Sequence, residues 1–347
     1  MSNDETNPNV ENPQPLATLR RRTIYSFVLR HSFVIRHSSF VIIFTNVIEI
    51  PAPDFDLAVT LDSGQVFHWQ KVGNGFVGTI KELPLYVEQG ENVLKVRCSG
   101  TPQPTPQRRA LPGIVVRYFA LDHPLAEICN SFPKDPVMNA ARDFCRGLQI
   151  IRQPKWECLA TFICSSMKQV AHIRQISLAL RKRFGEPRRI GDRLVYSFPP
   201  AHRLAQASEK ELLECKLGYR AKNLRATARL ITFGEADLEA WSALSDAELR
   251  KQLCGLPGVG PKIANCVMLF AFERLRAFPI DVWIERVLRQ HYFSGRKKMT
   301  AQRLREFSET YFGEYGGYAQ QYLFHHARSG DRAIEVNRPY LRRNERR

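Results

Sequence analysis

The segment LCGLPGVGPK, which ends at Lys262, constrains the fold more than any other part of the sequence. It contains Gly255, a residue type that commonly ends helices, and Pro261, which suits the first position of a new helix because its missing N–H is not needed there. A nearly unbroken apolar run then continues to Phe272. The pattern predicts a helix-hairpin-helix over residues 249–272, with a tight Pro-Gly-Val-Gly turn between the two helices.

The turn of this hairpin is typical of a phosphate-binding surface. Gly258 and Gly260 lack a Cβ, so a DNA backbone can approach closely, and the amides around Val259 can donate hydrogen bonds to phosphate at the start of a helix. Such contacts carry no base information, so the hairpin predicts DNA binding without sequence preference. An ordinary corner between two helices, capped by glycines, is the alternative interpretation.

The charge balance also favours DNA. The 347 residues include 51 Lys+Arg and 34 Asp+Glu, which leaves a net charge of +17. A chain this basic favours a polyanion, most often nucleic acid and less often an anionic membrane surface, although a solvated basic surface is the plainer alternative. The apolar fraction of 44% and the charged fraction of 24% exclude a fibrous or wholly disordered chain, and the length suits two domains.

The eight cysteines are scattered, and no two of them form a C-x-x-C pair. This spacing excludes a zinc or disulfide framework and is typical of free thiols in a reducing cytosol. No cysteine follows Cys266, which excludes a cysteine loop that could hold an iron–sulfur cluster near the C-terminus. We therefore expect a cytoplasmic protein without such a cluster.

Residues 1–45 differ from the rest of the chain, because they contain the near repeat SFVLRH, SFVIRH and SFVI after a run of three arginines. The repeat could be an interfacial anchor or a targeting peptide, and its frequent Arg and His residues argue against a membrane span. A disordered or nonfunctional extension, such as one translated from an upstream start, is the interpretation we favour.

The sequence pattern of residues 46–125 predicts a small antiparallel β domain. Apolar residues alternate between Leu57 and Cys98 and are interrupted by Gly- and Asn-containing turns, which indicates a meander. The first strand is expected at Val66–Gln70. Four prolines and two glycines between Gly100 and Gly113 predict a connecting loop.

From Val115 onward we expect helices only. The capping boxes Ser208 to Glu211 and Ser245 to Glu248 mark two helix starts. The fold class is therefore α+β, with a small antiparallel sheet followed by a helical region. We expect the helical domain to occupy residues 126–330 and a basic tail to occupy residues 331–347.

Lys262 and Asp281 are the candidate catalytic residues. A lysine amine in the first turn of an otherwise apolar helix is a candidate nucleophile, and a phosphate or ion-pair contact is its alternative role. Asp281 follows Phe-Pro-Ile and precedes an amphipathic segment, so it could simply be a helix N-cap. The hairpin, the lysine and the Pro-x-Asp pattern together favour the catalytic interpretation.

Seven short segments occur in the order found in one family of repair enzymes. They are Ser63–Trp69, Tyr118–Asp122, Glu157–Ser166, Leu217–Ala221, Leu256–Lys262, Pro279–Val282 and Tyr318–Phe324. From about Pro51 to about Ala327 the chain resembles the helix-hairpin-helix/Gly-Pro-Asp superfamily of DNA glycosylases, and within it the 8-oxoguanine DNA glycosylase/lyase branch. The resemblance implies removal of 8-oxoguanine from duplex DNA, followed by strand cleavage through a lysine Schiff base.

The resemblance also implies a role for each matching residue. Lys262 would attack C1′ of the damaged nucleotide, and Asp281 would stabilise the positive charge that develops on the sugar. The carbonyl of Gly64 would accept the N7–H that 8-oxoguanine has and guanine lacks. The remaining roles are assigned as follows: Cys266 and Phe324 would flank the flipped base, Gln320 would bind its Watson–Crick edge, Tyr219 would fill the gap in the helix, and Arg220 would contact the orphaned base.

The chain departs from the family pattern at two places. Animal and yeast members have an asparagine run and an arginine that contact the opposite cytosine, where this chain has Met167, Lys168, Gln169 and His172. A phosphate-contacting histidine is replaced by Trp283. We therefore expect a weakened preference for cytosine opposite the lesion.

Two other functions stay open at this stage. One is a monofunctional alkylated-base glycosylase, which would lack a lysine at the position of Lys262. The other is a non-catalytic helix-hairpin-helix module, which would need neither Asp281 nor the residues at 318–324. For the favoured glycosylase/lyase we expect damaged double-stranded DNA as the partner, a monomer without an obligate protein or membrane partner, and no cofactor, although the hairpin could hold a monovalent cation. The compartment would be the nucleoid in a prokaryote and the nucleus in a eukaryote.

Overall fold

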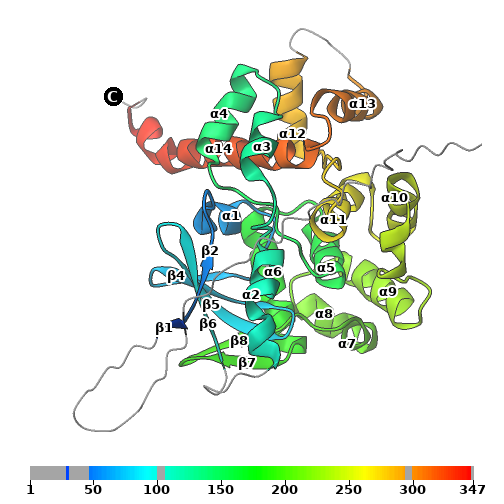
Figure 1. Cartoon of the computed structure of the whole chain (residues 1–347). Coiled ribbons are helices and arrows are strands. Elements are labelled where there is room, and N and C mark those ends of the chain that lie inside the picture. The colour runs from blue at the N-terminus through cyan, green and yellow to red at the C-terminus, as the bar shows by residue number, and fades with distance from the viewer. Residues whose placement is uncertain (1–28, 31–46, 100–105, 294–298, 345–347) are drawn as a thin grey trace, which may run out of the picture.

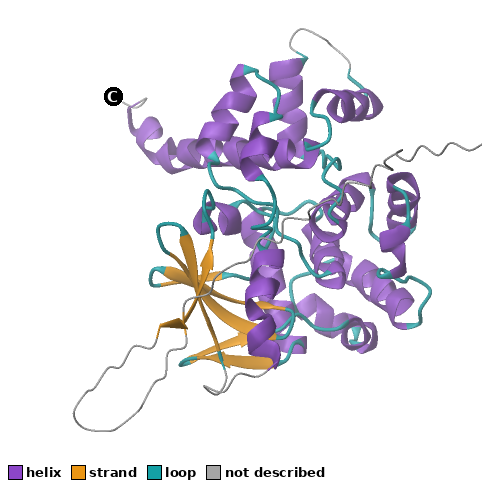
Figure 2. Cartoon of the chain, in the orientation of Figure 1, coloured by secondary structure: helices purple, strands orange, loops and turns teal. Residues whose placement is uncertain are grey.

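The computed structural model describes residues 29–30, 47–99, 106–293 and 299–344. Of the predicted extension over residues 1–45, only Leu29–Arg30 is described, so that prediction lies almost entirely outside the described residues. Figure 2 shows a sheet and two groups of helices around a centre where several loops gather. The α+β fold class is confirmed.

The sheet has the strand order β1-β2-β6-β5-β4-β3, and every neighbouring pair is antiparallel. Its strands are β1 (Leu29–Arg30), β2 (Val47–Pro51), β3 (Gln70–Val72), β4 (Gly75–Ile80), β5 (Leu83–Gln89) and β6 (Val93–Cys98). Alternate residues such as Leu85 and Val87 of β5 and Leu94 and Val96 of β6 are fully buried. The period-2 pattern therefore predicted this meander correctly.

Two sequence predictions at the start of the sheet are wrong. Residues 57–62 lie in the region predicted to be a β meander but form helix α1 (Leu57–Asp62), because Asp56 caps the helix by accepting a 2.8 Å hydrogen bond from the amide of Val59. Residues 66–69 form no strand either, and pairing begins only at Gln70. Their side chains are all buried, so this segment lacks the alternation of a half-exposed strand.

Two further boundaries also differ from the prediction. Helix α2 (Pro106–Tyr118) begins inside the predicted loop over residues 100–113 and includes Pro112. Burial of Leu111 and Val115 against the sheet outweighs the cost of that proline. The region predicted to be wholly helical also contains the hairpin of β7 (Pro187–Ile190) and β8 (Arg193–Tyr196), joined by a Gly-Asp turn.

Most of the helices form two groups (Figure 1). One group contains α3 (Leu125–Asn130), α4 (Pro136–Phe144), α12 (Val282–Val287), α13 (Ala301–Tyr311) and α14 (Gly316–Asn344). The other contains α5 (Lys155–Ser165), α7 (Ala201–Gln206), α8 (Glu209–Glu214), α9 (Arg220–Thr232), α10 (Asp246–Cys254) and α11 (Pro261–Phe272). Helix α6 (Val170–Phe184) lies beside the sheet, and a short 3-10 helix (Ala240–Ala243) and a π-helix (Leu288–Tyr292) complete the set.

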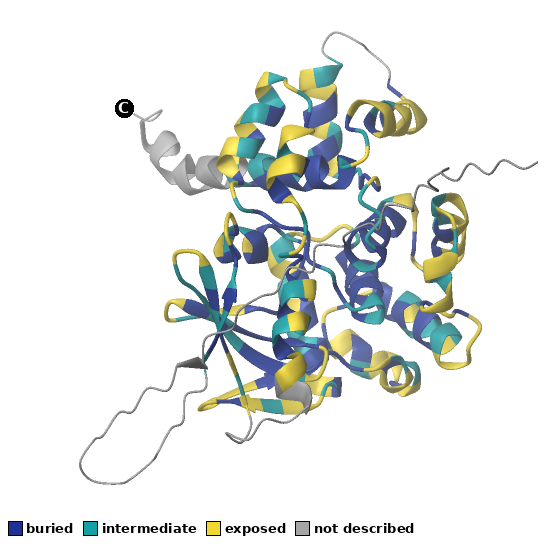
Figure 3. Ribbon diagram, in the orientation of Figure 1, coloured by how far each residue is buried: buried dark blue, intermediate teal, exposed yellow. Residues whose placement is uncertain are grey.

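Several predictions about the helices can be checked directly. Both capping boxes are present, at the starts of α8 and α10. Helix α11 is buried along nearly its whole length (Figure 3), as its apolar sequence requires. Helix α14 continues past residue 330, so the predicted start of the basic tail falls inside a helix. None of the helices within the described ranges combines the length and apolar character needed to cross a bilayer.

A polar cluster joins the two groups of helices where α11 ends. Glu273 caps α11 in the left-handed conformation. Its Oε1 atom accepts hydrogen bonds from Nε of Arg152 at 2.6 Å and from Nε2 of His123 at 2.9 Å. The hydrogen bond from His123, followed by the hydrogen bond and charge of Arg152, lowers the pKa of Glu273 to about 2.

This cluster predicts a specific loss of stability in acid. Because the folded pKa of Glu273 lies below its unfolded value, the carboxylate stabilises the fold above about pH 4.3, and that contribution disappears as the pH falls towards 2. The urea midpoint of the wild type should therefore exceed that of Glu273→Gln at pH 6, and the two midpoints should converge near pH 2. A constant difference at every pH would contradict this assignment.

Candidate active site

The predicted helix-hairpin-helix is present and is anchored on helix α9. Gly260 is the N-cap of α11, Pro261 is its first residue, and Gly258 has a φ of +81°. A Cβ on Gly258 would lie 2.8 Å from the Cβ of Asn223 in α9. The turn therefore requires glycine at this position both for its conformation and for its close approach to α9.

The hairpin amides are not all equivalent. The amide of Val259 donates to the carbonyl of Leu256 at 3.1 Å, and its side chain is buried. Within this structure Val259 therefore stabilises the turn itself. Gly260 is exposed, and the first turn of α11 has amides without an intrahelical partner, as at every helix N-terminus. This end of α11 is the part of the hairpin that can donate to a phosphate.

Lys262 lies half-buried in the first turn of α11. Its Nζ atom is 5.5 Å from the centroid of the Phe162 ring. Cys266 follows one helical turn later, and its buried thiol interacts with the Lys262 amine. Burial raises the pKa of Cys266 to about 11, against the opposing charge of Lys262, so this thiol is protonated at neutral pH.

Asp281 is both a helix cap and a neighbour of Lys262. Its Oδ1 atom accepts hydrogen bonds from the amides of Trp283 at 3.0 Å and Ile284 at 2.9 Å, which caps α12. Burial raises the pKa of Asp281, while the Ile284 amide and the charge of Lys262 act in the opposite direction. The side chain of Asn265 donates to the carbonyl of Phe278 at 3.3 Å, which ties α11 to the segment before Asp281.

Gly64 and Phe324 are brought together although 260 positions separate them. Gly64 has a φ of +87°, and a Cβ at this position would lie 3.0 Å from Cε1 of Phe324. The side-chain Nε2 of Gln321 donates to the backbone carbonyl of Ser63 at 2.9 Å, which fixes α14 beside residues 63–69, the Gly64 loop. Two of the predicted base-binding residues therefore form one surface.

Gln320 has a buried acceptor without a partner. Its side chain is 4% exposed, and within the part of the chain that the structure describes its Oε1 atom has no hydrogen-bond donor. An unpaired buried acceptor costs about 1–3 kcal/mol. A ligand that donates a hydrogen bond here would remove that cost, which fits the predicted contact with a base edge.

Tyr219 and Arg220 lie at the start of α9 with contrasting exposure. Tyr219 is 58% exposed, and the Arg220 guanidinium stacks 4.3 Å from the centroid of its ring. Arg220 is buried and donates to the carbonyls of Ser166 and Leu217. These bonds hold the turn that presents Met167, which is 91% exposed at a φ of +52°. Nothing in the sequence indicated this structural role of Arg220.

The comparisons with known proteins agree with this geometry. Residues 47–159 match the 8-oxoguanine DNA glycosylase N-terminal domain, and residues 160–310 match the HhH-GPD superfamily of base excision DNA repair proteins. The "N-glycosylase/DNA lyase OGG1" of Arabidopsis thaliana is 30% identical over 78% of this chain and 77% of its own length. This chain belongs to the 8-oxoguanine DNA glycosylase family.

Two further relatives cover the chain more fully. A "Probable N-glycosylase/DNA lyase" from Methanothermobacter thermautotrophicus is 29% identical over 80% of this chain and 95% of its own length. A crystal structure of the 8-oxoguanine glycosylase/lyase of Clostridium acetobutylicum, bound to DNA with cytosine opposite 8-oxoguanine, has a TM-score of 0.75 and 28% identity. That similarity covers 82% of this chain and 96% of the other. The family match therefore extends over both the sheet and the helices.

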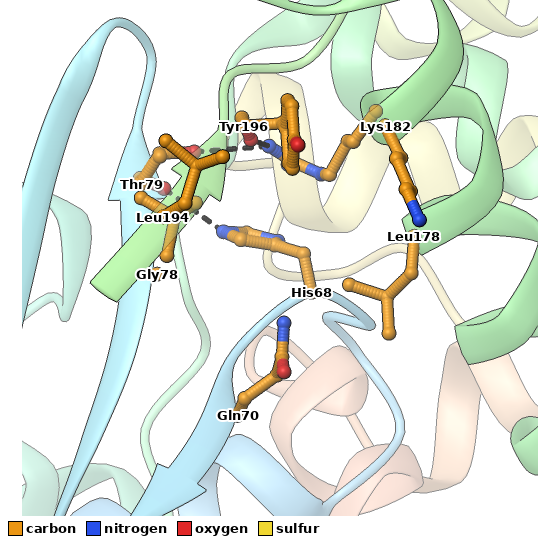
Figure 4. Close-up of a pocket in the computed structure, with 10 residues that line it drawn as sticks. His68, Gln70, Gly78, Thr79, Leu178, Lys182, Leu194 and Tyr196 are labelled. Atoms are coloured by element: carbon orange, nitrogen blue, oxygen red, sulfur yellow. Dashed lines mark hydrogen bonds between the residues drawn. The ribbon is translucent and has the colours of Figure 1, made fainter. Parts of the chain in front are cut away.

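A cavity of about 140 Å³ is lined by none of the predicted site residues. It is formed by the sheet, α6 and the β7–β8 hairpin, and Figure 4 shows His68 hydrogen-bonded to the Thr79 carbonyl at its edge. Burial lowers the pKa of His68 well below its usual value, so the ring is neutral. Its neighbour Glu157 pairs with the buried Arg181. This cluster joins the sheet to the helical domain and contains none of the predicted site residues.

The positive φ of Gly64 and the close approach of Phe324 predict that substitution of Gly64 slows base excision. Gly64→Ala adds a Cβ that meets the Phe324 ring and forces a left-handed conformation that alanine disfavours. Excision of 8-oxoguanine should fall by about 10²-fold, since a shift of about 1 Å in a reacting geometry has that effect. Single-turnover excision measures it, and Gly313→Ala, at a positive-φ glycine with open space around it, is the control. Unchanged excision by Gly64→Ala would contradict the assignment.

Proposed function

We propose that this chain removes 8-oxoguanine from duplex DNA and then cleaves the strand through a Schiff base on Lys262. The observation that carries the proposal is the cluster of Lys262, Cys266 and Asp281 at the start of the hairpin's second helix. The charges of the Lys262 amine and the buried Asp281 carboxylate interact, and Lys262 lies directly after the turn that we expect to bind phosphate. Family membership and the glycosylase/lyase relatives support the same activity.

The reaction begins with extrusion of the damaged nucleotide, because a stacked base cannot reach Lys262. Extrusion costs about a few kcal/mol, which contacts in the base pocket offset. The Lys262 nitrogen bonds to C1′ while the C1′–N9 bond breaks and the base leaves with a proton. The sugar ring then opens at O4′ to give the imine, and loss of a proton from C2′ expels the 3′ phosphate. Asp281 stabilises the positive charge on the sugar during the first step.

Several residues on or near α14 would each make one of the contacts that recognise the lesion. The Gly64 carbonyl accepts the N7–H of 8-oxoguanine, and Gln320 binds the Watson–Crick edge. Cys266 and Phe324 contact the two faces of the base. The buried, unpaired acceptor of Gln320 and the contact between Gly64 and Phe324 support this division.

The same proposal extends to partners, cofactors and location. Gly258, Val259 and Gly260 form the turn that faces the DNA backbone, and Tyr219 fills the gap left by the extruded base while Arg220 lies beside it. We propose a monomer that acts on damaged double-stranded DNA without a cofactor, since amine chemistry at C1′ needs neither a metal nor a redox group. A monovalent cation at the hairpin would only support the turn. The site of action would be wherever the chromosome lies, the nucleoid in a prokaryote or the nucleus in a eukaryote.

Borohydride trapping tests the function directly. Wild-type protein should form a covalent adduct with an 8-oxoguanine duplex and none with the matching guanine duplex. Release of a base without trapping would instead indicate a monofunctional glycosylase, which uses the aspartate but not the lysine. Binding to DNA without release of any base would indicate a non-catalytic module, and either outcome would overturn the proposal.

The opposite strand gives a separate prediction. Three exposed residues lie beside the start of α9: Met167, Lys168 and Gln169. The guanidinium of Arg220 already donates to two backbone carbonyls. Loss of good hydrogen bonds to a base removes about 1–3 kcal/mol of discrimination, so cytosine should be preferred only weakly. Single-turnover excision of 8-oxoguanine opposite each of the four bases measures this. A preference for cytosine of about a thousandfold or more, equal to some 4 kcal/mol, would contradict it.

A further inference from the structure

Residues 148–153 form a segment between α4 and α5 that has no helix or strand and is almost wholly buried. A buried segment of this kind must place its backbone amides and carbonyls on partners elsewhere in the molecule. Several of its partners come from the three elements that carry the predicted base-binding residues, and others lie in α1 and α2. The three elements are the Gly64 loop, α11 and α14.

The Gly64 loop is held through Gln65, whose side chain is fully buried. The side-chain Nε2 of Gln65 donates to the backbone carbonyl of Gln149 at 2.8 Å, and the backbone amide of Ile151 donates to Gln65 Oε1 at 2.7 Å. The backbone carbonyl of Gln65 accepts a third bond, at 2.7 Å, from the side chain of Gln153. The residue next to Gly64 is therefore fixed through both its side chain and its backbone.

Helix α11 is held by the same segment through its backbone. The amide of Gln153 donates to the carbonyl of Phe270 at 2.7 Å. Phe270 lies one helical turn after Cys266. Gln153 therefore bonds to the Gly64 loop with its side chain and to α11 with its backbone.

Helix α14 is held by two tyrosine hydroxyls. The Tyr318 hydroxyl donates to the side-chain oxygen of Gln149 at 2.6 Å, accepts from the backbone amide of Ile150 at 3.3 Å and also contacts Nδ1 of His123 at 2.7 Å. Tyr322 donates to the carbonyl of Leu148 at 3.0 Å. Because these tyrosines are four residues apart, they lie on one face of α14.

The predicted base-binding residues lie on the other side of α14. Gln320 and Phe324 each follow one of the two tyrosines by two residues, which is a rotation of about 200° around a helix. Bonds at Tyr318 and Tyr322 therefore set the rotation at which Gln320 and Phe324 face the Gly64 loop. The start of α14 is also close to α11, since a Cβ on Gly317 would clash with Cδ1 of Leu269.

We propose that residues 148–153 are the frame that aligns the three walls of the base pocket, and that Tyr318 and Gln65 are positioning residues for base excision. This inference rests on the proposed function. The two reactions of the enzyme should respond differently to misalignment. Excision needs the aligned pocket, whereas strand cleavage at an existing abasic site needs only Lys262, Asp281 and the hairpin. A loss of alignment therefore slows the first reaction and spares the second.

The test is Tyr318→Phe, which removes only the hydroxyl. Single-turnover excision of 8-oxoguanine should fall by about tenfold or more, since small displacements in a reactive geometry have effects up to about a hundredfold. Strand cleavage of a duplex with a preformed abasic site should stay within about twofold of wild type, because Lys262 and Asp281 lie on other elements. A loss of folded enzyme would lower both rates equally.

The matched control is Tyr86→Phe, which removes a half-buried tyrosine hydroxyl that donates to Glu88 at 3.2 Å within strand β5. Both of its rates should match the wild type. If Tyr318→Phe fails to fold, Tyr322→Phe provides the same test with the same expected separation. Equal rates of excision in the variant and the wild type, or equal losses in both reactions, would overturn the inference. An inactive wild type would instead overturn the proposed function.

Discussion

Lys262→Gln abolishes both excision of 8-oxoguanine and borohydride trapping, yet it keeps the affinity for lesion-containing DNA. Glutamine has no amine to bond C1′, and loss of a nucleophile lowers turnover by about 10⁴-fold or more. Binding survives because the hairpin turn and the residues around Gly64 and Phe324 are unchanged. Single-turnover excision, trapping and a binding titration on one duplex measure the three properties together.

Lys210→Gln is the matched control, because it removes an equal charge from an exposed position on α8. Its excision rate and its trapping should equal those of the wild type at moderate salt. A covalent adduct formed by Lys262→Gln would show that another amine attacks C1′. The assignment of Lys262 as the nucleophile would then be wrong.

The sequence predicted the hairpin well because its signals are local. Gly255 and Pro261 mark a helix end and a helix start within six positions, and the structure places both there. The two capping boxes are local signals of the same kind. The residues from 57 to 69 were predicted less well, since a single cap at Asp56 and burial on all sides outweighed a β-like composition.

The alignment of the site could not be predicted from local patterns. Gly64 touches Phe324, and Tyr318 bonds to Gln149, across separations of 260 and 169 positions. Each pair is specified by packing of the whole domain rather than by neighbouring residues. The family resemblance assigned roles to Gly64 and Phe324, but it gave no indication of the frame at residues 148–153 that holds them.

Asp281 has two roles, and Asp281→Asn separates them. Asparagine keeps the Oδ1 atom that accepts from the amides of Trp283 and Ile284, so the cap and the melting temperature should be nearly unchanged. It removes the negative charge, so single-turnover excision should fall by about 10²–10³-fold, the usual effect of losing one electrostatic stabiliser of a transition state.

The pH profile and a matched cap variant complete this prediction. Burial raises the pKa of Asp281, so the wild-type rate should increase with pH as that carboxyl ionises, and Asp281→Asn should lack this acidic limb. Asp56→Asn changes the N-cap of another six-residue helix, α1, and should have no effect on excision. If Asp281→Asn kept wild-type excision at every pH, the carboxylate would be only a helix cap, and stabilisation of the sugar cation would have to come from elsewhere.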